Sequence, residues 1–231
     1  YQKILIKSLY KFKNVQKIVA VSKEIENILK KEYSLKNTTT ILNPIIIDNT
    51  YKIKENLSKY QPYLVSAGRL NIQKNFEMLI KAYSKTKTQE KTKLLIVGEG
   101  NERTKLEQLI KNLKLEKKVL LIGQKENIKD YYLQSDMYVL SSSFEGFPNV
   151  LVEALSNSCA SIATNCPTGP NEIIINEENG LLVENENEEL MSKAIDRLYF
   201  DDELKKRFRS NAQKSIEHLK LEQIATKWLE I

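Results

Sequence analysis

The sequence predicts an α/β fold of the Rossmann-like type, in which a parallel sheet carries helices on both faces. Segments of strand length alternate with segments of helix length along the chain, a pattern typical of parallel strands joined by crossover helices. The pattern pauses near residue 43 and restarts at residue 63, which indicates two units of unequal size. The 231 residues are 41% apolar, which is enough for a sizeable core.

The first predicted element is an amphipathic helix before residue 15. Its apolar face carries Leu5, Leu9 and Phe12, and its basic face carries Lys3, Lys7 and Lys11. Residues 1–60 contain 12 basic and 5 acidic side chains, a balance of +7, whereas the rest of the chain contains 24 and 25, a balance of −1. Such a helix can rest on anionic lipid, or it can pack on a sheet with its lysines in solvent. The second interpretation is favoured because lysine is abundant throughout.

The next elements form a short β-α-β unit. Residues 18–22 are predicted to be a buried strand, and Ser22 is predicted to cap the helix that follows. Residues 39–42 form a second strand that ends at an Asn-Pro pair, which is incompatible with a helix. A unit of this size is too small for a domain. Residues 1–43 are therefore predicted to be the last part of an N-terminal domain.

From residue 63 the pattern is long enough for one complete domain of five or six strands. The predicted strands are 63–67, 93–97, 118–122, 137–140 and 160–163. The predicted helices are about 75–87, 101–113, 127–134 and 148–157. A last helix over about 218–230 has an apolar face that carries Leu221, Ile224, Trp228 and Leu229.

Residues 142–155 contain the most informative motif, in which two glutamates lie eight positions apart. Glu145 lies in a glycine-containing loop, and Glu153 lies inside a helix that Pro148 is predicted to begin. Free N–H groups are expected at this helix start, those of Asn149, Val150 and Leu151. Together with the helix dipole they attract a diphosphate, and the two carboxylates can accept hydrogen bonds from a sugar and a ribose. The alternative interpretation is a loop and an ordinary amphipathic helix with two solvated glutamates.

This glutamate pair resembles the E-x7-E signature of retaining GT4-type glycosyltransferases, the glycosyl transferases group 1. Four further segments are similar to motifs of that family in the same order, namely 63–76, 94–100, 119–123 and 132–143. The resemblance extends from about residue 15 to the C-terminus. Its specificity comes from the order and the spacing of the segments together.

The resemblance implies the GT-B fold, in which two Rossmann-like domains face each other across a cleft. Residues 61–216 correspond to a complete domain that binds the nucleotide-sugar donor, and residues 1–43 to a remnant of the mostly absent acceptor-binding N-terminal domain. Residues 44–60 correspond to the interdomain linker, and residues 217–231 to the helix that returns to the N-terminal domain. Residues 180–183 match the loop and strand before the C-terminal helices.

The resemblance also implies roles for the site residues. Gly68 lets the backbone approach the diphosphate, while Arg69 and Lys74 neutralise it and stabilise the leaving group. Glu145 is the third catalytic residue and accepts hydrogen bonds from the transferred sugar, and Glu153 accepts them from the ribose. The other donor-binding residues are Phe144, Gly146 and Phe147 around the sugar, Pro148, Asn149 and Val150 at the phosphate, and Glu99, Gly100, Gly123 and Gln124 around the base.

The implied function is transfer of a sugar, with retention of configuration, from a nucleoside-diphosphate donor to an acceptor hydroxyl, with neither cofactor nor metal. Residues 168–174 resemble a Gly-Pro-x-Glu-Ile variant found in bacterial polysaccharide and lipid-linked-oligosaccharide transferases. This favours a UDP-hexose or UDP-N-acetylhexosamine donor and a glycan or lipid-linked acceptor. The alternatives are an inactive nucleotide-sugar-binding fragment and a GT-B epimerase of nucleotide sugars.

Several other classes are disfavoured by the composition. No apolar run approaches the ~20 residues that span a bilayer, and no cluster of His, Cys or carboxylates has metal-ligand spacing. Cys159 and Cys166 lie in or near a buried strand and are predicted to be reduced thiols, which favours the cytoplasm, with peripheral contact at the inner membrane as the alternative. The G-x-G at 98–100 lacks the third glycine of a dinucleotide-binding motif. No nucleic-acid partner is expected. The Asp201-Asp202 pair is predicted to cap a helix.

Overall fold

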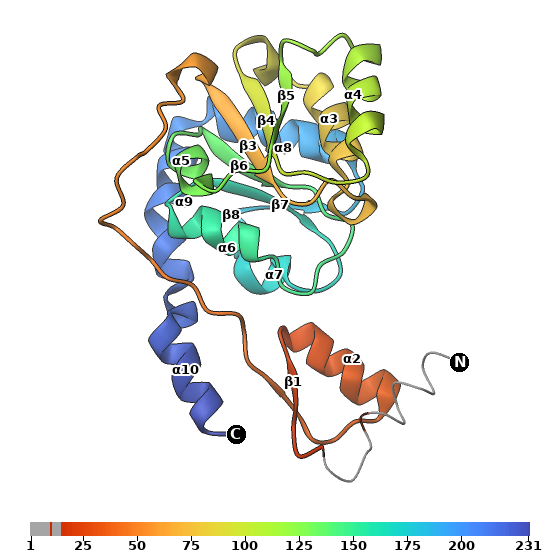
Figure 1. The fold of residues 1–231 in the computed structure, drawn as a ribbon, viewed down its shortest axis with the longest axis vertical. Helices are drawn as coiled ribbons and strands as arrows, with labels where there is room; N and C mark the ends of the chain where they lie inside the picture. The colour runs from red at the N-terminus through yellow and green to blue at the C-terminus, as the bar shows by residue number, and fades with distance from the viewer. Residues whose placement is uncertain (1–9, 11–14) are drawn as a thin grey trace.

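The computed structural model describes residue 10 and residues 15–231. A six-stranded α/β unit lies above a smaller β-α-β unit in the view of Figure 1, and an extended segment joins them. The amphipathic helix predicted before residue 15 lies, apart from residue 10, outside the described residues.

The main sheet has six parallel strands in the order β5-β4-β3-β6-β7-β8. Their bounds are Tyr63–Ala67 for β3, Lys93–Val97 for β4, Val119–Gly123 for β5, Met137–Leu140 for β6, Ser161–Asn165 for β7 and Gly180–Glu184 for β8. Counted from β3, this is the 3-2-1-4-5-6 order of a Rossmann fold, in which the strand order reverses between β3 and β6. The predicted parallel α/β sheet is confirmed.

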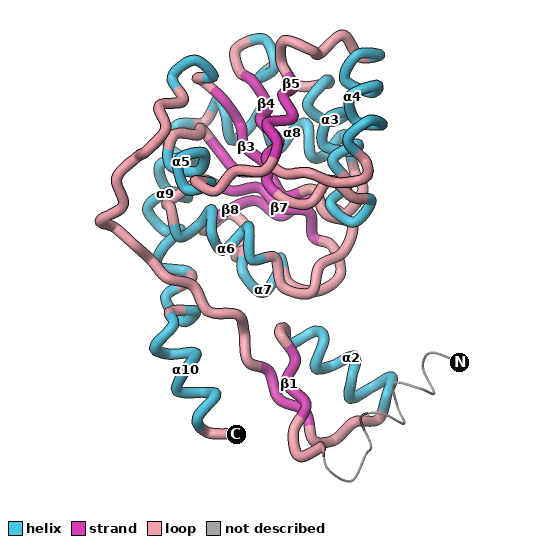
Figure 2. The backbone as a smooth tube through the Cα atoms, in the orientation of Figure 1, coloured by secondary structure: helices cyan, strands magenta, loops and turns pink. Residues whose placement is uncertain are grey.

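Helices cover both faces of this sheet (Figure 2). One face carries α3 (Phe76–Ser84), α4 (Arg103–Asn112) and α8 (Glu188–Phe200), and the other carries α5 (Ile128–Leu133), α6 (Asn149–Ser156) and α7 (Pro170–Ile173), while α9 (Asp202–Ser215) contributes to both cores. In β3, Leu64 belongs to the first core and Val65 to the second, because successive side chains of a strand point to opposite faces. Burial of each such side chain stabilises the fold by about 1.5–3 kcal/mol.

Element boundaries are where the structure departs from the predicted elements. The helix predicted at 75–87 is shorter, because Asn75 has a left-handed conformation and its side chain caps α3, while residues 72–74 form a separate 3-10 turn. The four residues of α7 were predicted as part of a motif and not as a helix, since so short a segment has no readable periodicity. Asp201 caps α9 through its side chain, as predicted. The last helix, α10, is Leu221–Leu229 and follows the 3-10 turn Glu217–Leu219.

The smaller unit, which we call the N-terminal unit, consists of β1 (Ile18–Ala20), α2 (Lys23–Tyr33) and β2 (Thr38–Thr40). The two strands pair in parallel and are shorter than predicted, at three residues each. Ser22 caps α2 as predicted, because its hydroxyl accepts a hydrogen bond from the N–H group of Ile25.

Glu26 is the buried anchor of this unit, with 3% of its surface exposed. Its carboxylate accepts hydrogen bonds from Thr38 and Thr40 of β2 and forms ion pairs with Lys23 and Lys30 of its own helix. Burial opposes ionisation, but the hydrogen bonds from Lys30, Thr40 and Lys23 outweigh it and lower the pKa of Glu26 to about 2.

We expect the N-terminal unit to loosen in acid because of Glu26. Its pKa in the folded state lies below the usual 4.5, so its contribution is complete above pH 4.5 and is lost as the pH falls towards 2. Glu26→Gln should remove charge-assisted bonds worth about 1.5–3 kcal/mol each at pH 7. Amide exchange of residues 23–33 tests this. Equal exchange in the variant and the parent protein at pH 7 would contradict the assignment.

The segment between the two units follows the surface of the larger one. The N–H groups of Lys54 and Glu55 donate to the Asp130 carboxylate of α5 at 3.1 and 2.9 Å, and the N–H group of Ile45 donates to the Leu219 carbonyl at 2.8 Å. The segment is therefore held in place along its length by hydrogen bonds to α5 and to the turn before α10.

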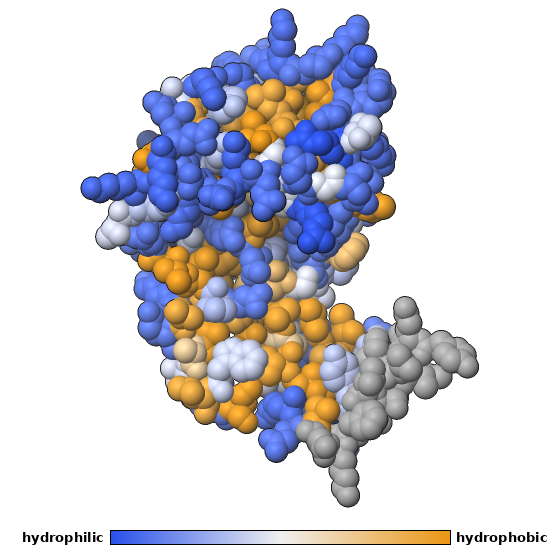
Figure 3. Space-filling view, viewed as in Figure 1, coloured by the Kyte–Doolittle hydropathy of each residue, from blue (hydrophilic) through white to orange (hydrophobic). Residues whose placement is uncertain are grey.

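Apolar side chains gather around α10 and the N-terminal unit (Figure 3). Ile46, Trp228 and Leu229 are 67%, 52% and 88% exposed. None of the helices in residues 15–231 combines the length and the apolar character needed to span a bilayer.

Candidate functional site

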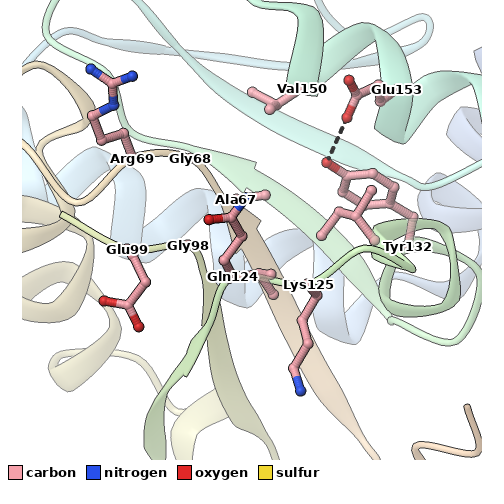
Figure 4. Close-up of a pocket in the computed structure, with 12 residues that line it drawn as sticks. Ala67, Gly68, Arg69, Gly98, Glu99, Gln124, Lys125, Tyr132, Val150 and Glu153 are labelled. Atoms are coloured by element: carbon pink, nitrogen blue, oxygen red, sulfur yellow. Dashed lines mark hydrogen bonds between the residues drawn. The ribbon is translucent and has the colours of Figure 1, made fainter.

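A cavity of about 320 Å³ lies where β3, β4 and β5 end and α5 and α6 pass over them (Figure 4). Its lining residues are Ala67, Gly68, Arg69, Val97, Gly98, Glu99, Gln124, Lys125, Ile128, Tyr132, Val150 and Glu153. It therefore occupies the carboxyl edge of a parallel sheet next to the reversal of strand order, where ligands bind in open α/β folds.

Two glycines line the cavity where the ends of β3 and β4 approach each other. Gly68 follows β3 and Gly98 follows β4, and a Cβ atom built on Gly98 would lie 1.9 Å from the carbonyl oxygen of Gly68. The φ angle of Gly98 is +147°, which L side chains rarely adopt. The N–H group of Gly68 donates to the Val97 carbonyl at 3.0 Å, and that of Gly98 donates to the Gly123 carbonyl at 2.9 Å. Hydrogen bonds between backbone groups thus join the ends of β3, β4 and β5, and the cavity lies next to these ends.

Glu153 directs its carboxylate into the cavity from α6 (Figure 4). The hydroxyl of Tyr132 donates a hydrogen bond to Glu153 Oε2 at 3.3 Å, and Tyr132 is itself buried against Tyr138, edge to face, with 5.7 Å between ring centroids. Burial raises the pKa of Glu153, and the hydrogen bond from Tyr132 partly opposes this. The carboxylate can accept further hydrogen bonds from a ligand.

Arg69 lies at the other side of the cavity, directly after the Gly68 turn (Figure 4). Among the described residues no carboxylate forms an ion pair with its guanidinium group. A cationic group that lines a cavity without a protein counter-ion can neutralise an anionic ligand there.

Lys74 and Glu145 lie outside the lining of the cavity and bind each other. Lys74 Nζ is 2.6 Å from Glu145 Oε1, and the side chains are 15% and 5% exposed. The hydroxyl of Ser142 also donates to Glu145 Oε1 at 2.6 Å, and the amide of Gln73 donates to Glu145 Oε2 at 3.4 Å. The charge of Glu145 is therefore balanced inside the protein by the residue that was expected to bind the diphosphate.

The start of α6 differs from the prediction. The helix begins at Asn149, and Pro148 is its N-cap residue with φ −78° and ψ 82°. The N–H group of Asn149 donates to the Phe147 carbonyl and that of Leu151 donates to the Pro148 carbonyl, both at 2.9 Å. The prediction of three free N–H groups is therefore wrong for two of them, because a tight turn satisfies them. The N–H group of Val150, whose residue lines the cavity, has no acceptor among the described residues.

The remaining predicted residues fall into two groups. Six predicted residues line the cavity, namely Gly68, Arg69, Glu99, Gln124, Val150 and Glu153. The other nine are not part of the lining, namely Lys74, Gly100, Gly123, Phe144, Glu145, Gly146, Phe147, Pro148 and Asn149. Phe144 is 54% exposed, whereas Phe147 is 7% exposed and belongs to a core. Glu99 faces Arg103, which donates to its carboxylate at 2.7 and 2.9 Å.

Six lining residues were not predicted, namely Ala67, Val97, Gly98, Lys125, Ile128 and Tyr132. Lys125 follows Gln124 directly, so the same loop could have indicated it. Tyr132 starts a segment already matched to the family, but its contact with Glu153 depends on the placement of α5 beside α6. Sequence position alone does not show that contact.

Metal ligands and reactive thiols are not grouped in the described part of the chain. No three His, Cys, Asp or Glu side chains among residue 10 and residues 15–231 are arranged to hold a metal ion. Cys159 and Cys166 are free and buried, as predicted, and burial raises the pKa of each thiol to about 11.

Fold and cavity together define a Rossmann-like domain with an open cavity at the carboxyl edge of its sheet, and comparison with known proteins places the chain in a family. A profile of the family "Glycosyl transferases group 1" matches residues 48–215, so the chain belongs to that family. The predicted resemblance is thereby confirmed, and with it the GT-B fold.

Two curated relatives illustrate the match. The chain is 37% identical over 200 residues to N-acetylgalactosamine-N,N'-diacetylbacillosaminyl-diphospho-undecaprenol 4-alpha-N-acetylgalactosaminyltransferase of Campylobacter jejuni, which covers 85% of this chain and 54% of that protein. It is 31% identical over 219 residues to the amylovoran biosynthesis glycosyltransferase AmsD of Erwinia amylovora, which covers 94% of this chain and 62% of that protein. The chain thus spans just over half the length of these relatives.

Solved structures agree with this assignment. A variant of TarM from S. aureus, in complex with Fondaparinux, alpha-GlcNAc-glycerol and UDP, superposes with a TM-score of 0.88 at 25% identity, covering 99% of this chain and 45% of that one. HepE of Anabaena in complex with UDP superposes with a TM-score of 0.89 at 20% identity, covering 99% and 66%, which shows the shared fold.

Proposed function

We propose that this chain is the donor-binding part of a retaining glycosyltransferase, and that the cavity between Gly68 and Glu153 binds the nucleoside diphosphate of a nucleotide sugar. The observation that carries the proposal is the pairing of two unlike groups in one cavity. A guanidinium group that forms no ion pair among the described residues, on Arg69, lies on one side, and a half-buried carboxylate, on Glu153, lies on the other. A nucleoside diphosphate has an anionic diphosphate that suits the Arg69 side of the cavity and two ribose hydroxyls that suit the Glu153 side.

The diphosphate is assigned to Arg69, to the open backbone at Gly68 and to the N–H group of Val150. Arg69 and the start of α6 supply positive charge, and Gly68 has no side chain to keep the phosphate away. The ribose is assigned to Glu153, and the base to the wall that Gln124 and Lys125 form. In this arrangement the protein stabilises the leaving nucleoside diphosphate electrostatically, and no side-chain nucleophile is required.

The ion pair of Lys74 and Glu145 is assigned to the transferred sugar. Lys74 holds the Glu145 carboxylate in place through an ion pair, and the carboxylate can accept hydrogen bonds from sugar hydroxyls. The Lys74 side chain packs against Gly68, and a Cβ atom built on Gly68 would lie 3.1 Å from Lys74 Cε. When a donor binds, Lys74 is therefore within reach of both Glu145 and the diphosphate. This pair connects the sugar position to the leaving group.

The donor proposed is a UDP-hexose or UDP-N-acetylhexosamine, and the acceptor proposed is a glycan or a lipid-linked glycan. The relative from Campylobacter jejuni is named as an N-acetylgalactosaminyltransferase acting on a diphospho-undecaprenol substrate, and the TarM complex contains UDP. A lipid-linked acceptor would bring the enzyme to the inner face of the membrane, where the basic balance of residues 1–60 would favour anionic lipid.

Residues 15–43 and α10 are proposed to complete a second GT-B domain that binds the acceptor. The apolar residues exposed on α10 and beside β2, such as Leu229 and Ile46, would pack against the rest of that domain.

Binding of UDP to the 231-residue chain tests the proposed function. Calorimetry should show one site per chain, and uridine without phosphates should bind more weakly because Arg69 then has no anion to neutralise. Absence of heat at millimolar UDP, with a folded protein by circular dichroism, would rule the proposal out.

We expect UDP affinity to be independent of divalent cations. The diphosphate is assigned to a guanidinium group and backbone N–H groups, so the binding mode contains no place that a cation must fill. Titrations in EDTA, in magnesium and in manganese should give the same dissociation constant. A loss of affinity in EDTA that manganese restores would show that the phosphate contacts are assigned wrongly.

We also expect the chain to bind UDP without transferring sugar on its own. Transfer needs the acceptor hydroxyl about 3–3.5 Å from the anomeric carbon in a cleft that excludes water, and one wall of that cleft is assigned to the acceptor domain. Release of UDP from UDP-N-acetylhexosamines can be followed with soluble and lipid-linked acceptors. Robust turnover would place the acceptor site within residues 1–231.

A further inference from the structure

The carboxylate of Glu172 lies at the N-terminus of α2, although Glu172 belongs to α7 of the larger unit. The N–H group of Lys23 donates to Glu172 Oε2 at 2.8 Å, and the N–H group of Glu24 donates to Glu172 Oε1 at 2.9 Å. Ser22 accepts from the next N–H group in its own helix. The first turn of α2 is therefore capped by two residues that lie 150 positions apart, one from each unit.

A carboxylate at the N-terminus of a helix forms a favourable contact although few atoms take part. The first N–H groups of a helix have no partner inside the helix, and the helix dipole favours a negative charge there. A carboxylate that accepts two N–H groups at once also fixes direction, because both bonds must stay aligned with the helix axis. The contact therefore constrains the orientation of α2, and not only its distance from α7.

The segment that carries Glu172 is hydrogen-bonded to the loop that contains Glu145, which we call the glutamate loop. The hydroxyl of Thr168 donates to the backbone carbonyl of Glu145, and the N–H group of Glu145 donates to the Pro167 carbonyl at 3.2 Å. Gly169 has φ +100°, and a Cβ atom there would lie 2.7 Å from Cδ of Pro148. The start of α7 is thus held directly against the loop that contains Glu145 and against the start of α6.

Further contacts join the two units in the same place. The amide of Asn171 donates to Glu24 Oε1 at 3.0 Å, and the amide of Asn43 donates to Asn149 Oδ1 at 3.0 Å. A Cβ atom on Gly146 would lie 3.8 Å from side-chain atoms of both Val21 and Ile25. The N-terminal unit therefore meets the larger unit at the glutamate motif, where Glu24 contributes a carboxylate from the N-terminal unit and Glu172 contributes one from the larger unit.

We infer that Glu172 is a latch that fixes the orientation of the N-terminal unit against the Glu145 loop, and that it is a positioning residue for sugar transfer. The second part of this inference depends on the proposed function, because it assigns the two units to opposite walls of the catalytic cleft. Residues 169–172, the Gly-Pro-x-Glu segment, then hold the two units together. None of these four residues lines the cavity. Holding the walls at one angle supplies the alignment that transfer requires.

The distance between the units is the direct test. Spin labels at Lys36→Cys in the N-terminal unit and Lys206→Cys on α9 occupy exposed positions, while Cys159 and Cys166 are 1% and 2% exposed and stay unlabelled. With Glu172 intact we expect one narrow distance distribution. Glu172→Ala should broaden it and speed exchange of the Lys23 and Glu24 amides by about tenfold or more, because these amides lose their acceptors. Glu172→Gln, which keeps one acceptor oxygen, should give an intermediate distribution.

Ser22→Ala is the matched control, because it removes the cap that lies inside the N-terminal unit. It should speed exchange of the Ile25 amide and leave the distance distribution narrow. UDP affinity of Glu172→Ala should stay within about twofold of the parent protein, since Glu172 lies outside the cavity. An unchanged distribution in Glu172→Ala would overturn the latch. A broadened distribution in a chain that does not bind UDP at all would support the latch and reject the proposed function.

Discussion

Replacing Glu153 by alanine is expected to weaken binding of UDP about tenfold or more. The carboxylate is the acceptor assigned to the ribose, and charge-assisted hydrogen bonds of this kind contribute about 1.5–3 kcal/mol, where 1.4 kcal/mol is a factor of ten. Burial raises the pKa of Glu153, so affinity should also fall as the pH drops through that raised value, because the protonated group loses its charge. Calorimetric titrations of both proteins between pH 5 and pH 8 measure these effects.

Two controls separate the ribose contact from a general loss of structure. UDP lacking the 2′ and 3′ hydroxyls should bind equally to the parent protein and to Glu153→Ala. Tyr132→Phe keeps the ring that packs on Tyr138 but removes the donor to Glu153, so it should lower UDP affinity less than Glu153→Ala does. If Glu153→Ala weakens both ligands alike, the carboxylate acts on folding and the ribose assignment fails.

Gly98→Ala is expected to have the largest effect on the cavity itself. The added methyl group would lie 1.9 Å from the carbonyl oxygen of Gly68, so the end of β3 or of β4 must move. Overpacking of this kind costs about 1–3 kcal/mol, and the unfavourable backbone conformation adds a similar amount. We expect a clear fall in thermal stability together with loss of UDP binding, since the Gly68 turn belongs to the wall to which the diphosphate is assigned.

Gly146→Ala is the matched control for that substitution. Its Cβ atom would lie 3.8 Å from Val21 and Ile25 side chains, an ordinary contact distance, and its stability should change by less than about 1 kcal/mol. Thermal unfolding of both variants, followed by circular dichroism, makes the comparison. Similar unfolding temperatures for the two variants would mean that the structure tolerates a side chain at Gly98, between the ends of β3 and β4.

The sequence predicted β3 and β4 well because each is a mostly apolar run between turn residues. Nearly all residues of these two strands are buried, so their signal did not depend on neighbours. Helix ends were less predictable because caps decide them. Asn75 and the turn at Pro148 each shifted a helix start by one residue, and both depend on local backbone geometry that apolar periodicity does not report.

The candidate site was predictable where one strand and its following turn supply the residue. Gly68 and Arg69 follow β3 directly, and Glu153 lies on the helix after the glutamate loop, so all three reach the cavity as expected. Contacts between distant segments were not predictable. The ion pair of Lys74 with Glu145 and the hydrogen bond of Tyr132 to Glu153 join residues 71 and 21 positions apart, and only the assembled sheet brings them together.

A crystal structure of the chain with UDP tests the central claim most directly. We expect the ribose hydroxyls within hydrogen-bonding distance of the Glu153 carboxylate, the diphosphate between Arg69 and the N–H group of Val150, and the base beside Gln124 and Lys125. UDP bound elsewhere, or bound in this cavity with its phosphates at Glu153 and its base at Arg69, would contradict it.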